Sequence, residues 1–127
     1  MSDLERFVRA QDGGVYERAL RELAAGRKQT HWIWFVLPQP AGLGHSEMSR
    51  RYAIADLDEA RAYLAHPVLG PRLVECCRAV LASGVEDPVA IMGDLDARKL
   101  RSCMTLFAEV AADPSPFTAV LERLFVR

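Results

Sequence analysis

The chain lacks the features that mark membrane-spanning, secreted and nucleic-acid-binding proteins. Its longest apolar run, 32–38, is far too short to cross a bilayer, and the charged N-terminus has no apolar signal core. The net charge is −1 and no basic stripe is present, so we expect neither a nucleic-acid nor a membrane partner. The three cysteines are an odd number, and two are adjacent, which favours reduced thiols and a cytoplasmic location.

Motifs of metal and cofactor chemistry are also missing. The sequence has no phosphate-binding P-loop, no dinucleotide-binding glycine pattern, no paired-cysteine zinc spacing and no metalloprotease helix. The three histidines, His31, His45 and His66, are far apart, and nothing in the sequence brings them around one ion. We therefore expect neither a metal nor a cofactor.

Lysine is rare: of the 16 basic residues, only Lys28 and Lys99 are lysines and the others are arginines. A lysine ammonium is a compact point charge that arginine does not replace at an anion-binding or nucleophilic position. The two lysines are therefore candidate site residues, although chance explains so small a number equally well.

The remaining sequence is typical of one globular helical domain. Of its 127 residues, 50% are hydrophobic and 26% are charged, and alternating patterns of the strand type are nearly absent. We predict a single all-α domain over 1–127, a compact orthogonal array of about six to eight short helices. The helices are expected to end near residues 12, 25, 37, 52, 65, 83, 111 and 127, with one further short turn closed by Gly93.

Helix caps support these boundaries. Small polar residues that can accept a hydrogen bond from the first turn precede most of the expected helices, namely Ser2 or Asp3, Thr30, Ser46, Asp56, Asp87, Asp94 or Asp96, and Ser115. Gly26 stands where a left-handed residue ends the second helix. For 31–37 a strand is the alternative, because Trp, Ile, Phe and Val all favour strands.

Both tryptophans fall in this short segment. A helix that is apolar all round must be buried, so at least one of Trp32 and Trp34 is expected in the core, with a polar partner for its indole N–H. His31 is either a structural or a catalytic residue. Glu22, one helix turn before Gly26, reaches the same region as Lys28, and the two could form a simple salt bridge.

The loop that follows contains Gln39, Gly42, Gly44 and Ser46. Glycines allow close backbone approach, and the helix that Ser46 begins has free N–H groups that favour an anion. This arrangement suits a phosphate or a carboxylate. An ordinary turn with a helix cap has the same sequence pattern.

A second group of polar residues lies on one long helix. Asp96 and Lys99 are spaced for an ion pair, and Ser102 follows one turn later. Such a pair is most often exposed and of little energetic value, but beside the tryptophans Lys99 would become an anion ligand or a general base. Arg72, near a helix N-terminus, opposes the helix dipole, and it therefore either binds a ligand or packs its stem.

The chain resembles the bacterial domain-of-unknown-function family 1810 over nearly its whole length. The resemblance is carried by Gln11, Tyr16, Glu22-Leu23, Gly26, Lys28, His31-Trp32, Trp34-Phe35, Pro38-Gln39, Gly42-Leu43-Gly44, Ser46, Tyr63-Leu64, His66-Pro67, Leu69-Gly70, Arg72-Leu73, Asp96, Lys99, Ser102 and Met104-Thr105-Leu106-Phe107. It implies a small, helical, cytoplasmic protein and leaves the activity open. Some members carry the label calpastatin, which implies a calpain inhibitor. Such inhibitors are long, disordered and repetitive, whereas this sequence is apolar and compact.

Two functions remain open at this stage. The first is a domain that binds a small anionic ligand, nucleotide-like or sugar-phosphate-like, with acid–base or hydrolytic chemistry. Its pocket would be lined by Trp32, Trp34, Gln39 and the loop 42–46, with polar groups from Lys28, His31, Asp96 and Lys99. The second is a helical protein-interaction module or a structural homodimer. The first requires that the glycine loop and the Asp96 helix face each other across a hollow.

Overall fold

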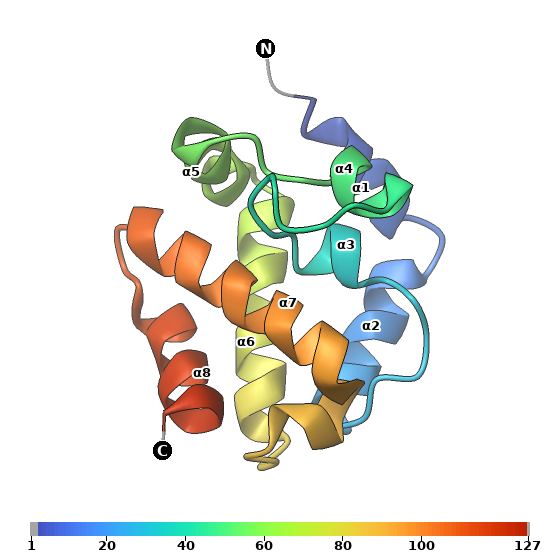
Figure 1. Ribbon diagram of the computed structural model, residues 1–127, viewed down its shortest axis with the longest axis vertical. Coiled ribbons are helices and arrows are strands. Elements are labelled where there is room, and N and C mark those ends of the chain that lie inside the picture. The colour runs from blue at the N-terminus through green and yellow to red at the C-terminus, as the bar shows by residue number, and fades with distance from the viewer. Residues whose placement is uncertain (1–2, 127) are drawn as a thin grey trace.

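A computed structural model describes residues 3–126 and shows an all-α fold (Figure 1). Within these residues eight helices follow one another: α1 (Glu5–Gln11), α2 (Val15–Ala24), α3 (Ile33–Val36), α4 (Glu47–Arg51), α5 (Leu57–Ala65), α6 (Leu69–Ala82), α7 (Pro88–Val110) and α8 (Ser115–Phe125). The all-α prediction is confirmed. The alternative of a strand over 31–37 is wrong, because α3 lies there, although this helix is only four residues long.

The long helix α7 organises the array. It crosses in front of α6 and packs against α8, α5 and α3 (Figure 1). Gly93 has a φ of +84°, which breaks the helix into a short first turn and a long second part, as the sequence indicates. Within residues 3–126, no helix is both long enough and apolar enough to cross a bilayer.

Aromatic rings run through the core from one end to the other. Successive ring centroids lie 5.2 to 6.0 Å apart along the series Phe35, Tyr52, Phe7, Tyr63, Phe107 and Phe117. Edge-to-face and tilted pairs at this spacing add to the free energy gained by burial. Trp32 is fully buried in the same core, as predicted for at least one tryptophan, whereas Trp34 is only half-buried.

Several predicted caps are confirmed by side-chain hydrogen bonds. Ser46, Asp56 and Asp87 each accept a bond from a backbone N–H in the first turn of α4, α5 and α7. Gly26 has a φ of +71° and ends α2 with the two backbone bonds of a Schellman motif, donated by Gly26 and Arg27. A side chain at Gly26 would also collide with Val85.

Four predicted caps are wrong. The Asp94 and Asp96 carboxylates pair with Arg98, Lys28 and Lys99 and do not cap the long part of α7. The α1 helix begins after Leu4 without a side-chain cap, since the Asp3 carboxylate accepts a bond from Arg9, and Ser2 lies outside the described residues. Thr30 does not cap α3, because its hydroxyl donates to Glu22 instead. Ser115 is the first residue of α8, and its own N–H donates to Asp113.

The loop between α3 and α4 is held by backbone bonds. Ile54 N–H donates to the Gln39 carbonyl at 3.0 Å, and Ala41 N–H donates to the Ile54 carbonyl at 2.9 Å. These bonds form an isolated parallel bridge between Pro40 and Ile54. The loop is therefore fixed against the segment that follows α4, and it stands beside the middle of α7 (Figure 1).

Candidate functional site

The buried carboxylate of Glu22 holds the segment that leads into α3. Its oxygens accept hydrogen bonds from the backbone N–H groups of Gln29 and Thr30, from the Thr30 hydroxyl and from the Trp32 indole, at 2.7 to 3.0 Å. Burial alone would raise the pKa of Glu22, but these four donors stabilise the carboxylate and lower its pKa to about 2. The partner expected for a buried indole is therefore Glu22, and the Glu22–Lys28 salt bridge considered from the sequence is not formed.

Lys28 pairs with Asp96 instead. Its Nζ lies 3.0 Å from Asp96 Oδ2, donates to the Thr30 carbonyl at 2.6 Å, and stands 5.0 Å from the centre of the Trp32 ring. The side chain of Lys28 is only 6% exposed. All the contacts of this ammonium are therefore inside the protein.

Lys99 occupies the other side of the same carboxylate. Its Nζ lies 3.6 Å from Asp96 Oδ1 and 5.4 Å from the centre of the Trp34 ring. The 3.6 Å separation is too long for a hydrogen bond, so this pair is held by charge alone. Two ammonium groups thus share one carboxylate, and the cluster of three has a net charge of +1.

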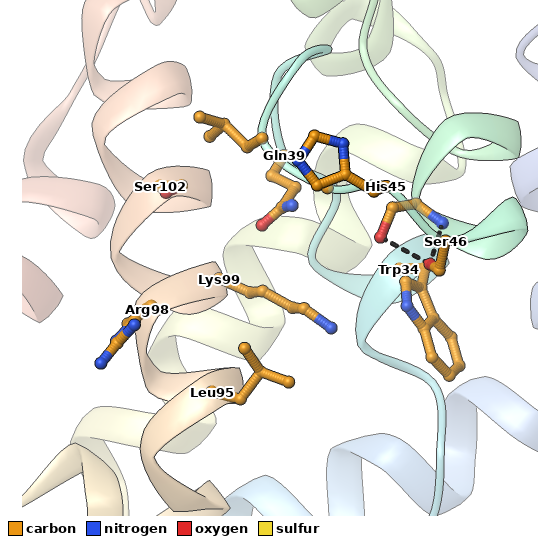
Figure 2. A pocket seen from close by; sticks show the side chains of 11 residues that line it. Trp34, Gln39, His45, Ser46, Leu95, Arg98, Lys99 and Ser102 are labelled. Atoms are coloured by element: carbon orange, nitrogen blue, oxygen red, sulfur yellow. Dashed lines mark hydrogen bonds between the residues drawn. The ribbon is translucent and has the colours of Figure 1, made fainter.

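The Lys99 ammonium faces a cavity of about 510 Å³ between α7 and the loop 39–46 (Figure 2). Figure 2 shows the lysine side chain extending from α7 toward Trp34 and Ser46. Four segments line this cavity: α3 with Trp34, α4 with Ser49, α7 with Leu95, Arg98, Lys99 and Ser102, and the loop with Gln39, Leu43, Gly44, His45 and Ser46.

The lining of this cavity carries basic and neutral polar groups and no carboxylate. Arg98 is paired with Asp94 at 3.0 Å, and its guanidinium points away from the Lys99 ammonium (Figure 2). Gly44 brings the loop into close contact with α4, since a Cβ atom there would come within 2.5 Å of the Ser49 side chain. Lys99 is therefore the cation that faces the cavity, opposite amide and hydroxyl groups.

The structure gives little support to the expected anion site at the start of α4. The helix has only five residues, and the Ser49 N–H already donates to the Ser46 hydroxyl at 3.0 Å. Ser46 and Ser49 also bond each other through their hydroxyls at 2.9 Å (Figure 2). Any affinity of this cavity for anions must therefore come from side chains, chiefly Lys99.

Comparison with known proteins agrees with the sequence resemblance. The family model described as "Protein of unknown function (DUF1810)" matches residues 1–126. The chain belongs to this family. A crystal structure of a conserved hypothetical protein from Mycobacterium tuberculosis is similar, with 47% sequence identity, a TM-score of 0.93, and coverage of 97% of this chain and 87% of that chain. None of the curated proteins matches.

In this DUF1810 chain the predicted site residues fall into three groups. Six of them line the Lys99 cavity: Trp34, Gln39, Gly44, Ser46, Lys99 and Ser102. Lys28, His31 and Asp96 line a second hollow of about 390 Å³ on the opposite side of Lys99, which shares Trp34 and Leu95 with the first. Trp32 lies behind both in the core, and Gly42 is exposed on the loop without lining either hollow.

Arg72 belongs to a different part of the molecule. Its guanidinium donates to the Gln11 amide oxygen at 3.1 Å and lies 4.6 Å from the centre of the Tyr16 ring. These contacts join α6 to α1 and α2, and they offset the unfavourable dipole at the start of α6. These contacts give Arg72 a packing role, and its role in ligand binding stays a prediction without support from either hollow.

Three lining residues were missed from the sequence: Ser49, Leu95 and Arg98. Leu43 and His45 also line the cavity, and they belong to the loop 42–46 that the sequence analysis placed there. Leu95 and Arg98 had a weak signal, because they precede Lys99 by about one turn or less on the same helix. Ser49 had none, because its place depends on how the loop folds back onto α4.

The cysteines take no part in this site. Cys76, Cys77 and Cys103 are free and buried. Burial raises the pKa of Cys77 to about 12 and holds the pKa values of Cys76 and Cys103 well above that of an ordinary thiol. A thiol that stays protonated is a poor nucleophile, so these residues act as small apolar groups of the core.

Proposed function

We propose that the Lys99 cavity binds a small anionic ligand through a phosphate or carboxylate group. The observation that carries this proposal is the Lys99 ammonium, which faces a cavity whose lining has no carboxylate. Its single ion-pair partner, Asp96, is shared with Lys28 and is 3.6 Å away. An incoming anion would complete the neutralisation of this cluster without displacing a hydrogen bond.

The remaining lining suits an organic anion. The Trp34 ring supplies an apolar wall, while Gln39, Ser49 and Ser102 supply amide and hydroxyl groups that can bond phosphate or sugar oxygens. A nucleotide-like or sugar-phosphate-like ligand matches both parts. Within residues 3–126 no histidine hydrogen-bonds a serine hydroxyl, so the geometry supports binding better than nucleophilic hydrolysis. The buried free thiols support a reducing compartment, and we propose the cytoplasm.

Thermal unfolding in the presence of anions tests the proposal. Inorganic phosphate, a sugar phosphate and a nucleoside monophosphate should each be titrated, since a ligand at a hundred times its Kd stabilises the folded state by about 2.7 kcal/mol. We expect saturable stabilisation by at least one of them in the wild type and in Arg123→Met, which removes a cation of α8 outside this cavity. Lys99→Met should abolish it. Stabilisation that persists in Lys99→Met would assign the anion to another site and overturn the proposal.

A protein-interaction module or homodimer is the second candidate, favoured by the exposure of two leucines at the mouth of the cavity. Leu43 is 56% exposed and Leu95 is 65% exposed. Exposed leucines on this scale mark contact surfaces when they cluster. Light scattering of the wild type and of Leu43→Ser/Leu95→Ser separates the candidates, because a dimer through this face would dissociate in the double variant.

A further inference from the structure

Another hollow, distinct from the one lined by Lys28 and Asp96, lies next to the Lys99 cavity along α7. It has a volume of about 510 Å³ and shares Leu43 and Ser102 with the first cavity. Its other lining residues are Pro40, Leu57, Arg101, Thr105, Leu106 and Glu109. The two hollows therefore adjoin each other beside α7, with Leu43 between them, and together we call them the groove.

This groove changes in character along its length. Lys99 and the hydroxyl and amide groups lie at one end, and Leu43, Leu57, Pro40 and Leu106 gather at the other. Along the helix axis, Lys99 and Leu106 are about 10 Å apart. The apolar part also carries Arg101 and Glu109, whose opposite charges offset each other. The groove is therefore cationic at the Lys99 end and nearly neutral at the other.

Exposed leucines are concentrated on this groove. Five large hydrophobic residues are strongly exposed within residues 3–126, and Leu43, Leu57 and Leu95 all line one of its two parts. Leu43 lies on a loop that is held by backbone hydrogen bonds from Ile54 to Gln39 and from Ala41 to Ile54. Its exposed side chain is therefore held in place on the groove. Apolar surface held open in this way gains free energy when an apolar group covers it.

We propose that the ligand is a soluble anionic amphiphile, a carboxylate or phosphate carried on a short apolar chain. This inference rests on the proposed function and narrows the ligand class. The head group pairs with Lys99, and the chain runs along Leu43 and Leu57 toward Leu106. A free molecule fits better than a lipid surface, because Arg101 and Glu109 give the rim both signs of charge, whereas anionic membranes select clusters of basic residues.

Calorimetric titration with a series of monomeric alkanoates tests this inference. Butanoate, hexanoate and octanoate carry one head group on chains of increasing length, and inorganic phosphate serves as the probe without a chain. We expect affinity to rise about two- to fourfold for each methylene that enters the groove. In Leu57→Ser, which lines only the hollow farther from Lys99, this dependence on length should weaken for the longer alkanoates while butanoate affinity is kept. Val89→Ser removes an exposed valine of α7 that lines neither hollow, and it should behave as the wild type.

The outcomes separate this inference from the proposed function. If phosphate or butanoate binds in a Lys99-dependent way but chain length has no effect, the amphiphile is wrong and the anion site stands. A chain-length effect that is unchanged in Leu57→Ser puts the chain elsewhere and also overturns the inference. Binding to phosphatidylglycerol vesicles without binding to any monomeric alkanoate contradicts a soluble ligand. If none of these probes and none of the sugar phosphates or nucleotides binds, both proposals fail.

Discussion

Lys28 and Lys99 occupy nearly matching positions on the two sides of Asp96. Each ammonium stands over a tryptophan, Lys28 at 5.0 Å from the Trp32 ring and Lys99 at 5.4 Å from the Trp34 ring. Each is paired with one oxygen of the same carboxylate, at 3.0 and 3.6 Å. Their side chains are 6% and 17% exposed, so burial alone separates them only slightly.

The difference lies in how far the charge of each ammonium is satisfied. Lys28 has a short ion pair and a carbonyl acceptor, and the chain around it is fixed by the Glu22 carboxylate. Lys99 has one long ion pair and an open cavity. The same residue type next to the same carboxylate is therefore part of the scaffold in one case and, in our proposal, a binding group in the other. Substitutions on the Lys28 side of Asp96 should therefore lower stability, whereas a substitution on the Lys99 side should affect ligand binding.

The largest effect is expected on the scaffold side, from Glu22→Ala. The substitution removes the acceptor of three N–H donors and one hydroxyl, two of which belong to Thr30. Buried donors left without partners cost 1–3 kcal/mol each, so we expect a loss of about 3 kcal/mol or more in the free energy of unfolding. Urea unfolding measures it through the midpoint. Glu17→Ala, an exposed change on the same helix, is the control, and an equally small effect in both variants would contradict this account of the segment.

A somewhat smaller effect is expected from Lys28→Met. The variant keeps an apolar stem of similar length but removes the cation that neutralises Asp96 and donates to the Thr30 carbonyl. Removing one partner of a buried pair costs 3–5 kcal/mol when the other is left alone. Here Lys99 remains beside Asp96, so about 2 kcal/mol is the expected loss in urea unfolding. A loss below about 0.5 kcal/mol would mean that Lys28 is no more structural than a surface lysine.

The helices could be predicted from the sequence because their signals are local. Asp56, Asp87 and Ser46 cap the helices that follow them, and Gly26 ends α2, since each of these roles depends on neighbours within one turn. Thr30 failed as a cap for the opposite reason. A buried carboxylate from α2 competes for its hydroxyl, and no local pattern announces that contact.

The candidate site was predictable only in part. The loop containing Gly44 and Ser46 faces Lys99 and Ser102, as the ligand-binding hypothesis requires. The sequence could not divide the polar residues between two hollows, because that depends on which side of Asp96 each lysine approaches. The packing of Arg72 could not be predicted, because its partners, Gln11 and Tyr16, lie more than fifty residues earlier in the chain.

Acid should weaken the scaffold side through Glu22. Its pKa is lowered from 4.5 to about 2 in the folded protein, so the folded state favours the carboxylate more than the unfolded state does. The resulting stability is fully present above pH 4.5 and is lost as the pH falls toward 2. We expect this loss, on the order of 2–3 kcal/mol, in urea unfolding measured across that interval. Glu22→Gln should give a flatter acid limb, and an identical limb in both proteins would assign the acid sensitivity to other groups.

The smallest effect on stability is expected from Lys99→Met, and it sharpens the comparison most. The pair with Asp96 is long, and Lys28 still neutralises the carboxylate when Lys99 is gone. A change below about 1 kcal/mol in the free energy of unfolding follows, as for an ordinary surface pair. The two lysine variants should therefore affect different measurements. Lys28→Met should lower the stability of the free protein, whereas Lys99→Met should leave that stability nearly unchanged and remove the stabilisation by phosphate. If Lys99→Met destabilised the free protein as much as Lys28→Met, both lysines would belong to the scaffold. The cavity would then have no cation available for an anionic ligand.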